Sequence, residues 1–436
     1  MYHPAAHDDG LRMALQDLRT GRWMSMRKLL AGTECWTLWT ARTQVLAAAA
    51  AGSTVVQAWR EEEPESTAAL VMHTRVSVER TLRAHRTGHP RTAELAHEAW
   101  QACRVAVREA PADPVPWVCL LALAQVDRRR ASAECATRPP EPLLPTGPWG
   151  LLEQADRRDP CNREAYHRML QCLKTWSGDG RTDSVHFVRW VVSWAPRGAS
   201  LLALPLYVSA DLYRAQRRRA PGRALELHWI TEHAVGDAER ALHCWFDHAD
   251  RATRSPLDLN YLAHALWAAR LYDGAARVFE ELGPYATPLP WAYRTGDPDR
   301  PELAEEEFLR ARERCLAAAT GTAGGRAPGR TPANGGSGGS GGSGEGEGEG
   351  ASADGSGGGV GGSEGGRAAH ADSGPGRGSE DAGDDAADAA EDADGSYGPY
   401  SPYEPHRARG PLGAPGRAGP RGPYGSVVPP PRVPTP

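Results

Sequence analysis

The residues best suited to chemistry are concentrated between positions 224 and 249, where the chain carries four histidines and a cysteine: His228, His233, His243, His248 and Cys244. Cys244 and His248 are four residues apart, so on a helix they would share a face, as the first two ligands of a metal site must. His243 and Asp247 have the same spacing and could act as an acid–base pair. No second pair with ligand spacing is visible elsewhere. A metalloenzyme that uses Cys244 and His248 is therefore kept as an alternative hypothesis. The leading expectation is a protein without a metal, a cofactor or catalytic residues.

Five arginines within ten residues form the strongest basic cluster: Arg214, Arg217, Arg218, Arg219 and Arg223. Such a cluster could bind phosphate, nucleic acid or an acidic partner. Only two of the 50 basic residues are lysines, a bias typical of a GC-rich genome, which weakens arginine clustering as evidence for binding. A regulatory protein that binds nucleic acid or an anionic ligand here is thus a second alternative, although the net charge of −5 argues against nucleic acid.

Sequence motifs of the common enzyme classes are missing. The chain has no GxxxxGK[ST] phosphate loop and no HExxH pair. Its glycine runs after residue 320 follow no strand pattern and open no helix, as a nucleophile elbow or a dinucleotide-binding loop would require. The sequence therefore favours a protein that is not an enzyme.

The elements that must position these residues are helices, and Leu257 to Gly283 shows the pattern best. Its apolar and small residues recur at three- and four-residue steps on two successive segments. These residues are Leu259, Leu262, Ala263 and Leu266 on the first segment, then Tyr272, Ala275, Phe279 and Leu282 on the second. Their order and spacing resemble a tetratricopeptide repeat over 257–288. The resemblance implies a solenoid of antiparallel helical hairpins and does not identify a ligand.

A recurring junction supports more units of this kind. A proline that ends one helix is followed two residues later by a residue that can cap the next helix, and six residues later by a bulky apolar one. The four occurrences are Pro64-Ser66-Leu70, Pro111-Asp113-Trp117, Pro160-Asn162-Tyr166 and Pro196-Gly198-Leu202. The prolines are 36 to 49 residues apart by position, so the array departs from the regular period of about 34.

These patterns predict an all-α fold: a right-handed α-solenoid of tetratricopeptide-like hairpins over residues 1–320. Further helices are expected in the segments Leu11–Leu30, Trp36–Ala51, Ala224–Ala249 and Pro301–Ala319, the last as a polar cap on the array. Residues 128–148, rich in Pro and Arg, are expected to form an inserted loop.

Residues 321–436 are expected to form a second, disordered region. All four Phe and all fourteen Trp lie before it, so it has too little apolar surface to fold. It contains a Gly/Ser/Glu linker (321–366), an acidic block (380–394) and a segment rich in Tyr, Pro and Arg (397–436). The last segment is suited to polyproline-type docking.

The cysteines and the start of the chain indicate a cytoplasmic protein. The eight cysteines form no CxxC pair and lie mostly in helix-like apolar runs, which is typical of reduced, buried thiols. The start, MYHPAAHDDG, lacks the pattern of a secretory signal. The apolar runs are too short to span a bilayer, so no membrane partner is expected.

The leading hypothesis is a non-catalytic interaction scaffold that binds a peptide or partner helix in the groove of the solenoid. If the hairpins follow the tetratricopeptide layout, residues beside the core positions of the first helix should line this groove. The candidates are Asn260, His264 and Trp267, which would offer an amide, a switchable hydrogen bond and an apolar wall. The identity of the unknown protein or peptide does not follow from the sequence.

Overall fold

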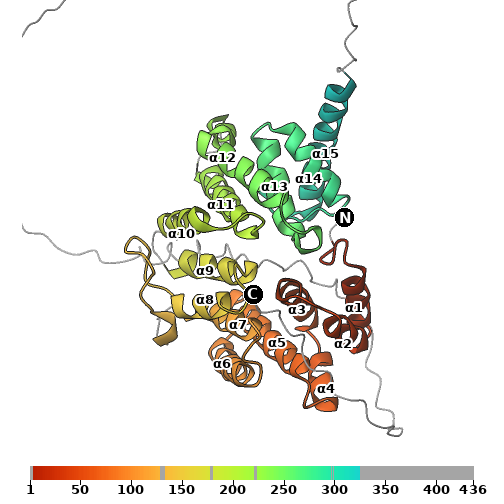
Figure 1. Cartoon of the computed structure of the whole chain (residues 1–436), viewed down its shortest axis with the longest axis vertical. Coiled ribbons are helices and arrows are strands. Elements are labelled where there is room, and N and C mark those ends of the chain that lie inside the picture. The colour runs from red at the N-terminus through yellow and green to blue at the C-terminus, as the bar shows by residue number, and fades with distance from the viewer. Residues whose placement is uncertain are drawn as a thin grey trace, which may run out of the picture. The chain divides into compact units, whose positions relative to one another are not determined.

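The computed structural model describes residues 3–127, 133–176, 180–219, 223–295, 297 and 299–324, and every regular element in these ranges is a helix (Figure 1). The α-helices are α1 (Asp9–Arg19), α2 (Met24–Ala31), α3 (Trp36–Ala50), α4 (Val55–Glu62), α5 (Thr67–Arg86), α6 (Thr92–Glu109), α7 (Val115–Ala124), α8 (Trp149–Asp156), α9 (Arg163–Trp176), α10 (Gly180–Trp194), α11 (Leu204–Arg219), α12 (Glu232–Arg240), α13 (Pro256–Ala268), α14 (Tyr272–Leu282) and α15 (Pro301–Gly324). The shorter helical turns are η1 (Ala133–Cys135), η2 (Ser200–Ala203), η3 (Arg223–Ile230), η4 (Ala241–Phe246), η5 (Arg251–Thr253) and η6 (Trp291–Arg294). The expected all-α class is confirmed for these residues.

The proline junctions begin helices as the sequence predicts. Ser66 is the N-cap of α5 and accepts a hydrogen bond from the backbone N–H of Ala69. Asp113 accepts one from Val115 at the start of α7, and the Asn162 side chain caps α9 in the same way. Each side chain satisfies a backbone donor that the first helical turn leaves without a partner.

The α13–α14 hairpin also matches the sequence pattern. The turn at 269–271 joins two helices that pack closely against each other. Every apolar residue that defined the two faces, from Leu259 to Leu282, is buried, apart from the half-buried Tyr272 at the start of α14. The two faces belong to the same hydrophobic cluster, which also includes residues of α11, η4 and α15.

The segment expected to be one helix over 224–249 is broken into three pieces. η3 is a 3-10 turn, Thr231 caps the new helix α12, and the chain then widens into the π-helical turn η4. Thr231 is the physical reason for the first break, because its hydroxyl accepts a hydrogen bond from Ala234 and so begins a new helix. The expected helix over 301–319 is confirmed as α15.

The inserted loop expected at 128–148 is described from residue 133. It contains η1 and one isolated antiparallel bridge between Thr137 and Gly147, which closes the loop before α8. Residues 128–132, 220–222 and 325–436 lie outside the described residues, and so do the acidic block, the segment 397–436 and the linker after Gly324. Helix α15 runs to Gly324, four residues into the expected linker.

The expectation of buried thiols holds for most of the cysteines. Five thiols are buried, Cys161 and Cys244 are half-buried, Cys35 is exposed, and none of these eight described residues forms a disulfide. Among the described residues, none of the helices has both the length and the apolar surface needed to cross a bilayer.

Buried charges join the helices around α9. Glu164 accepts from Arg75 of α5 at 2.9 and 2.6 Å and from Arg168 one turn later at 3.0 Å. Arg168 also reaches Glu79 at 3.3 Å. All four side chains are buried, and each charge has an opposite partner, which is the condition for holding ions away from water.

The N-terminal residues contact the end of α14, about 270 positions later in the chain. The His7 ring stacks edge-on against Tyr285 at 4.7 Å, and its Nε2 lies 3.1 Å from the carbonyl oxygen of Glu281. Arg12 donates to the Tyr285 hydroxyl at 2.8 Å. An array in which each hairpin contacts only its neighbours would not make these contacts.

Candidate functional site

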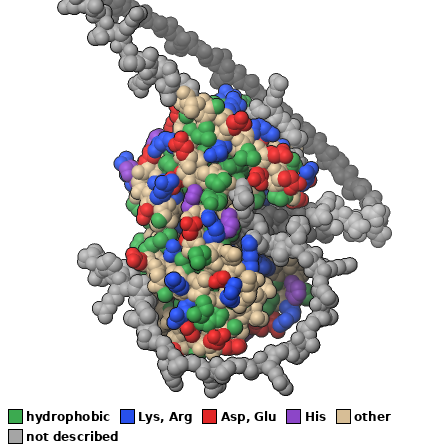
Figure 2. Space-filling model, turned by 90° about the vertical axis from the view of Figure 1, so that its right-hand side faces the viewer, with side chains coloured by type: hydrophobic (Ala, Val, Ile, Leu, Met, Phe, Trp, Pro, Cys, Tyr) green, Lys and Arg blue, Asp and Glu red, His purple; other side chains and the backbone are tan. Residues whose placement is uncertain are grey.

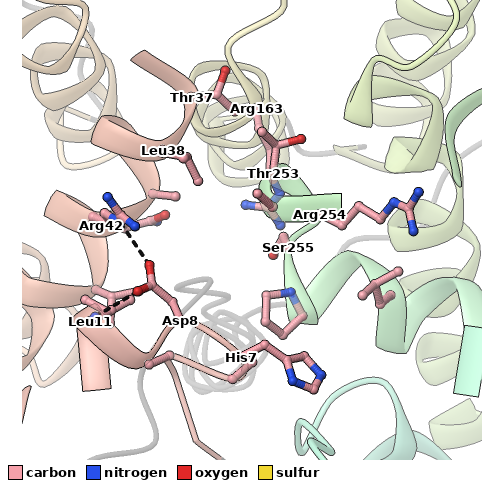
Figure 3. A pocket seen from close by; sticks show the side chains of 18 of the residues that line it. His7, Asp8, Leu11, Thr37, Leu38, Arg42, Arg163, Thr253, Arg254 and Ser255 are labelled. Carbon is pink, nitrogen blue, oxygen red and sulfur yellow. Dashed lines mark hydrogen bonds and ion pairs between the residues drawn. The ribbon is translucent and has the colours of Figure 1, made fainter. Parts of the chain in front are cut away.

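A concave site lies where the N-terminal segment and α3 face residues 250–259 and the end of α14 (Figure 3). The N-terminus of α9 also lines it. Its volume is about 720 Å³, within the range of ligand sites. We call this site the cleft. It exists because chain segments far apart in sequence meet there.

One wall of the cleft is fixed by Asp8. Its carboxylate accepts a hydrogen bond from Leu11 at 2.8 Å, which caps α1, and it also pairs with Arg42 of α3 at 2.9 Å. Arg42 in turn donates to the Thr33 hydroxyl. Leu38, one helical turn before Arg42, adds apolar surface to the same wall (Figure 3).

The opposite wall carries a second ion-pair group. Arg251 and Arg254 lie 2.8 and 3.6 Å from the Glu281 carboxylate. Arg254 also lies 4.5 Å above the Phe246 ring and donates to the Ala249 carbonyl. Both arginines are therefore held by groups of the protein itself.

The floor comes from the start of α9 and the turn before it. Arg163 donates two hydrogen bonds of 2.6 Å to Asp258 on α13, which is also bound by the Tyr207 hydroxyl. Glu164 belongs to the buried network around α9. These two floor charges are thus neutralised from behind the cleft.

Asp159 is the floor residue whose charge is not neutralised. It is 8% exposed, and its carboxylate accepts a hydrogen bond from the Asn162 amide at 2.6 Å. Burial raises the pKa of its carboxyl to about 6, the hydrogen bond from Asn162 opposes the rise, and the neighbouring Asp156 adds to it. No arginine, lysine or histidine among the described residues forms an ion pair with it.

Two neutral polar groups in the cleft also have unused hydrogen-bonding capacity. The Gln44 side chain is 4% exposed, and its Nε2 has no hydrogen-bond partner among the described residues. The buried Ser255 hydroxyl on the opposite wall also has no hydrogen-bond partner among the described residues. Buried polar groups in proteins are nearly always paired, so both groups are available to bond to a ligand or to water.

The charge balance of the cleft is negative. Four arginines line it: Arg42 and Arg163 each have their own carboxylate partner, and Arg251 and Arg254 share Glu281. Asp250 caps η5 through its bond to Ala252 and, like Asp159, forms no ion pair with a cation among the described residues. The electrostatics therefore suit a cationic group with apolar neighbours.

The residues proposed for the groove do not line the cleft. Asn260 and His264 are 0% and 1% exposed, so their expected placement on an open groove wall is wrong. Asn260 donates to the Pro256 and Tyr285 carbonyls and accepts from Thr287 and from Trp291. It ties α13 to the segment that covers it.

His264 lies in a cage of indole rings. The centroids of Trp229 and Trp291 are 5.0 and 5.1 Å from its own, and burial first, then Arg294 and His228, hold its pKa well below the usual range. Trp267 is half-buried beneath Arg294, whose guanidinium lies 4.6 Å from the ring. These side chains join α13 to the segment 284–294.

The four arginines of the cluster whose side chains are described fall into a packed pair and an exposed pair. Arg217 donates to the Tyr293 carbonyl at 2.8 Å, and Arg214 lies 5.5 Å from the Tyr293 ring. Arg218 and Arg219 are exposed, and the side chain of Arg223 lies outside the described part of the chain. On the face shown in Figure 2, acidic and basic side chains are interspersed.

The His/Cys stretch gives one of its two expected contacts. His243 Nδ1 lies 3.2 Å from Asp247, which is also bound by Arg277. Cys244 is half-buried and His248 exposed, and no three His, Cys, Asp or Glu residues in the described ranges lie together as a metal site requires.

The sequence signal for the cleft was present only in part. Asn162 was recognised as a cap, but Asp159 beside it and Gln44 carry no motif. Comparison with known proteins gives no name for the site, because no family model, no curated protein and no solved structure matches this chain.

Proposed function

We propose that this chain is a non-catalytic protein-interaction protein, a modified helical-hairpin array of tetratricopeptide type, whose cleft binds a short extended peptide. The proline junctions and the α13–α14 hairpin support the repeat layout. The contacts of His7 and Arg12 with Tyr285 modify it, because they bring the first helices next to α14 and so create the cleft.

The observation that carries the proposal is the unmet hydrogen-bonding capacity of the cleft. Gln44 can donate to a peptide carbonyl, and the Ser255 hydroxyl can donate or accept. Leu38, Leu259 and Leu282 add apolar atoms to the lining of the same cleft. A peptide offers alternating backbone polar groups and side chains, which matches this arrangement of partners.

The test is selection of random displayed peptides on the full-length protein, followed by affinity measurement with the variant Leu38→Arg. This substitution fills the cleft with a bulky cation and should weaken binding of selected peptides at least tenfold. Arg218→Ala, on the exposed end of α11, is the control and should leave the affinity unchanged. Selected peptides that bind Leu38→Arg as tightly as the unaltered protein would refute the proposal, provided circular dichroism shows the variant folded.

A further inference from the structure

We infer that the cleft binds this chain's own C-terminal segment, residues 397–436, through an arginine seated at Asp159. This inference rests on the proposed function, because it names the peptide that the cleft takes. It also assigns a role to the segment that the sequence marks as suited to docking.

Charge complementarity is the first argument. The arginines that line the cleft all contact carboxylates, with Arg251 and Arg254 sharing Glu281, whereas Asp159 in the floor and Asp250 at the rim have no cationic partner among the described residues. Residues 397–436 contain five arginines and one glutamate. An incoming guanidinium would supply the charge that Asp159 lacks, with two donors in a fork that fits a carboxylate.

The neighbouring groups of the cleft fit a proline-rich backbone. Gln44 Nε2 is buried without a partner and can donate to a carbonyl oxygen. Proline-rich chains favour the polyproline II form, which leaves its carbonyls unpaired and loses little entropy on binding. The segment contains twelve prolines and four tyrosines, whose rings can pack on Leu38 and Leu259.

The length of the connecting chain allows the contact. The last described helix, α15, packs against α14, and the end of α14 lines the cleft. Residues 325–396 then separate α15 from the segment. A Gly-rich tether of that length has a root-mean-square span of about 45 Å, comparable with the diameter of a folded unit of this size. Its effective concentration at the cleft is on the order of millimolar, so even a weak contact would be occupied.

The experiment measures competition within the full chain. A fluorescent synthetic peptide of residues 397–436 is titrated with the full-length protein and with a full-length variant in which the segment's five arginines are replaced by glutamine. The substituted positions are Arg407, Arg409, Arg417, Arg421 and Arg432. The variant should bind the labelled peptide about tenfold more tightly than the unaltered chain, because its own segment no longer competes.

Substitutions in the cleft identify the binding site when they are added to the variant whose segment 397–436 lacks arginine. Asp159→Asn should weaken peptide binding about tenfold and Gln44→Ala about threefold. Glu94→Gln is the matched control: it removes one carboxylate from the exposed Arg91–Glu94 pair on α6, outside the cleft, and should leave the affinity unchanged. The effect of Asp159→Asn should shrink as salt is raised.

Three results would overturn the inference: equal peptide affinity for the two full-length chains, no peptide binding to either, or binding that Asp159→Asn leaves intact. The last result would show that the arginines bind elsewhere, for example at the acidic block 380–394. If the segment 397–436 does not bind but the selected library peptides still bind in a way that depends on Leu38, the proposed function stands and only this inference fails. Loss of both kinds of binding would remove the proposed function as well.

Discussion

Two groups of buried polar side chains meet at α9, and they differ in how completely they are paired. Behind the helix, Arg75, Glu164 and Arg168 form a network in which each charge has an opposite partner. In the cleft, Asp159 lacks a cation and Gln44 lacks an acceptor among the described residues. The comparison separates two roles for buried polarity: the paired groups fix how the helices meet, and in our proposal the unpaired groups of the cleft receive a ligand.

The largest effect should come from breaking the paired network. Glu164→Ala leaves two buried guanidinium groups without their shared carboxylate and should lower the free energy of unfolding by about 3–5 kcal/mol, measured by urea denaturation with tryptophan fluorescence. Replacing all four members, Arg75, Glu79, Glu164 and Arg168, by leucine should cost less than this single change. A loss below about 1 kcal/mol for Glu164→Ala would show that the network does not hold the helices.

The next effect concerns Asn260, which is fully paired although the sequence suggested a binding role. Asn260→Ala strands the Trp291 and Thr287 N–H groups and should cost about 1–3 kcal/mol in the same assay. Gln57→Ala removes an exposed amide of α4 and should change stability by less than about 0.5 kcal/mol. Equal losses for the two variants would contradict the pairing seen at Asn260.

The next prediction concerns how the contribution of Asp159, in the cleft, to stability depends on pH. Burial raises the pKa of Asp159 from 3.8 to about 6, so between those values the folded protein holds a proton that the unfolded chain has released. Asp159 therefore lowers stability progressively as pH rises from about 4 to 6, and the loss persists above that range. Asp159→Asn should stabilise the protein at pH 8, by at most about 3 kcal/mol, and change it little near pH 4.

Denaturation at the two pH values checks this sign. Asp113 continues to respond in the variant, because burial also raises its pKa, to about 7. The relevant quantity is therefore the difference between the variant and the unaltered protein at each pH. The same difference at pH 4 and pH 8 would show that the Asp159 carboxyl is not buried as described.

The smallest expected effect lies outside both groups, at a helix start. Ser66→Ala removes the N-cap of α5 and should lower the free energy of unfolding by about 1 kcal/mol. Ser66→Asp retains an acceptor at the same position and should keep the stability. If the two variants behaved alike, the cap would contribute nothing.

The sequence by itself determined the local features of this protein. Helix starts at Ser66, Asp113 and Asn162 follow from short-range hydrogen bonds, and the buried faces of α13 and α14 follow from apolar spacing within a few turns. Such features depend on residues that are close in the chain, so spacing predicts them. The break at Thr231 also had a local signal, since a threonine followed by Glu232 is typical of a helix start.

Only the tertiary structure decided which polar faces reach solvent and which polar groups share a site. The segment 284–294 covers Asn260 and His264 on α13. The apolar ring of Trp291 favours a buried position for this segment, but no spacing rule says which helix the segment covers. The cleft likewise joins Asp8, Asp159 and Asp250, each from a different part of the chain. The physical reason is that burial and charge balance are sums over all neighbours in space, and most of those neighbours are distant in sequence.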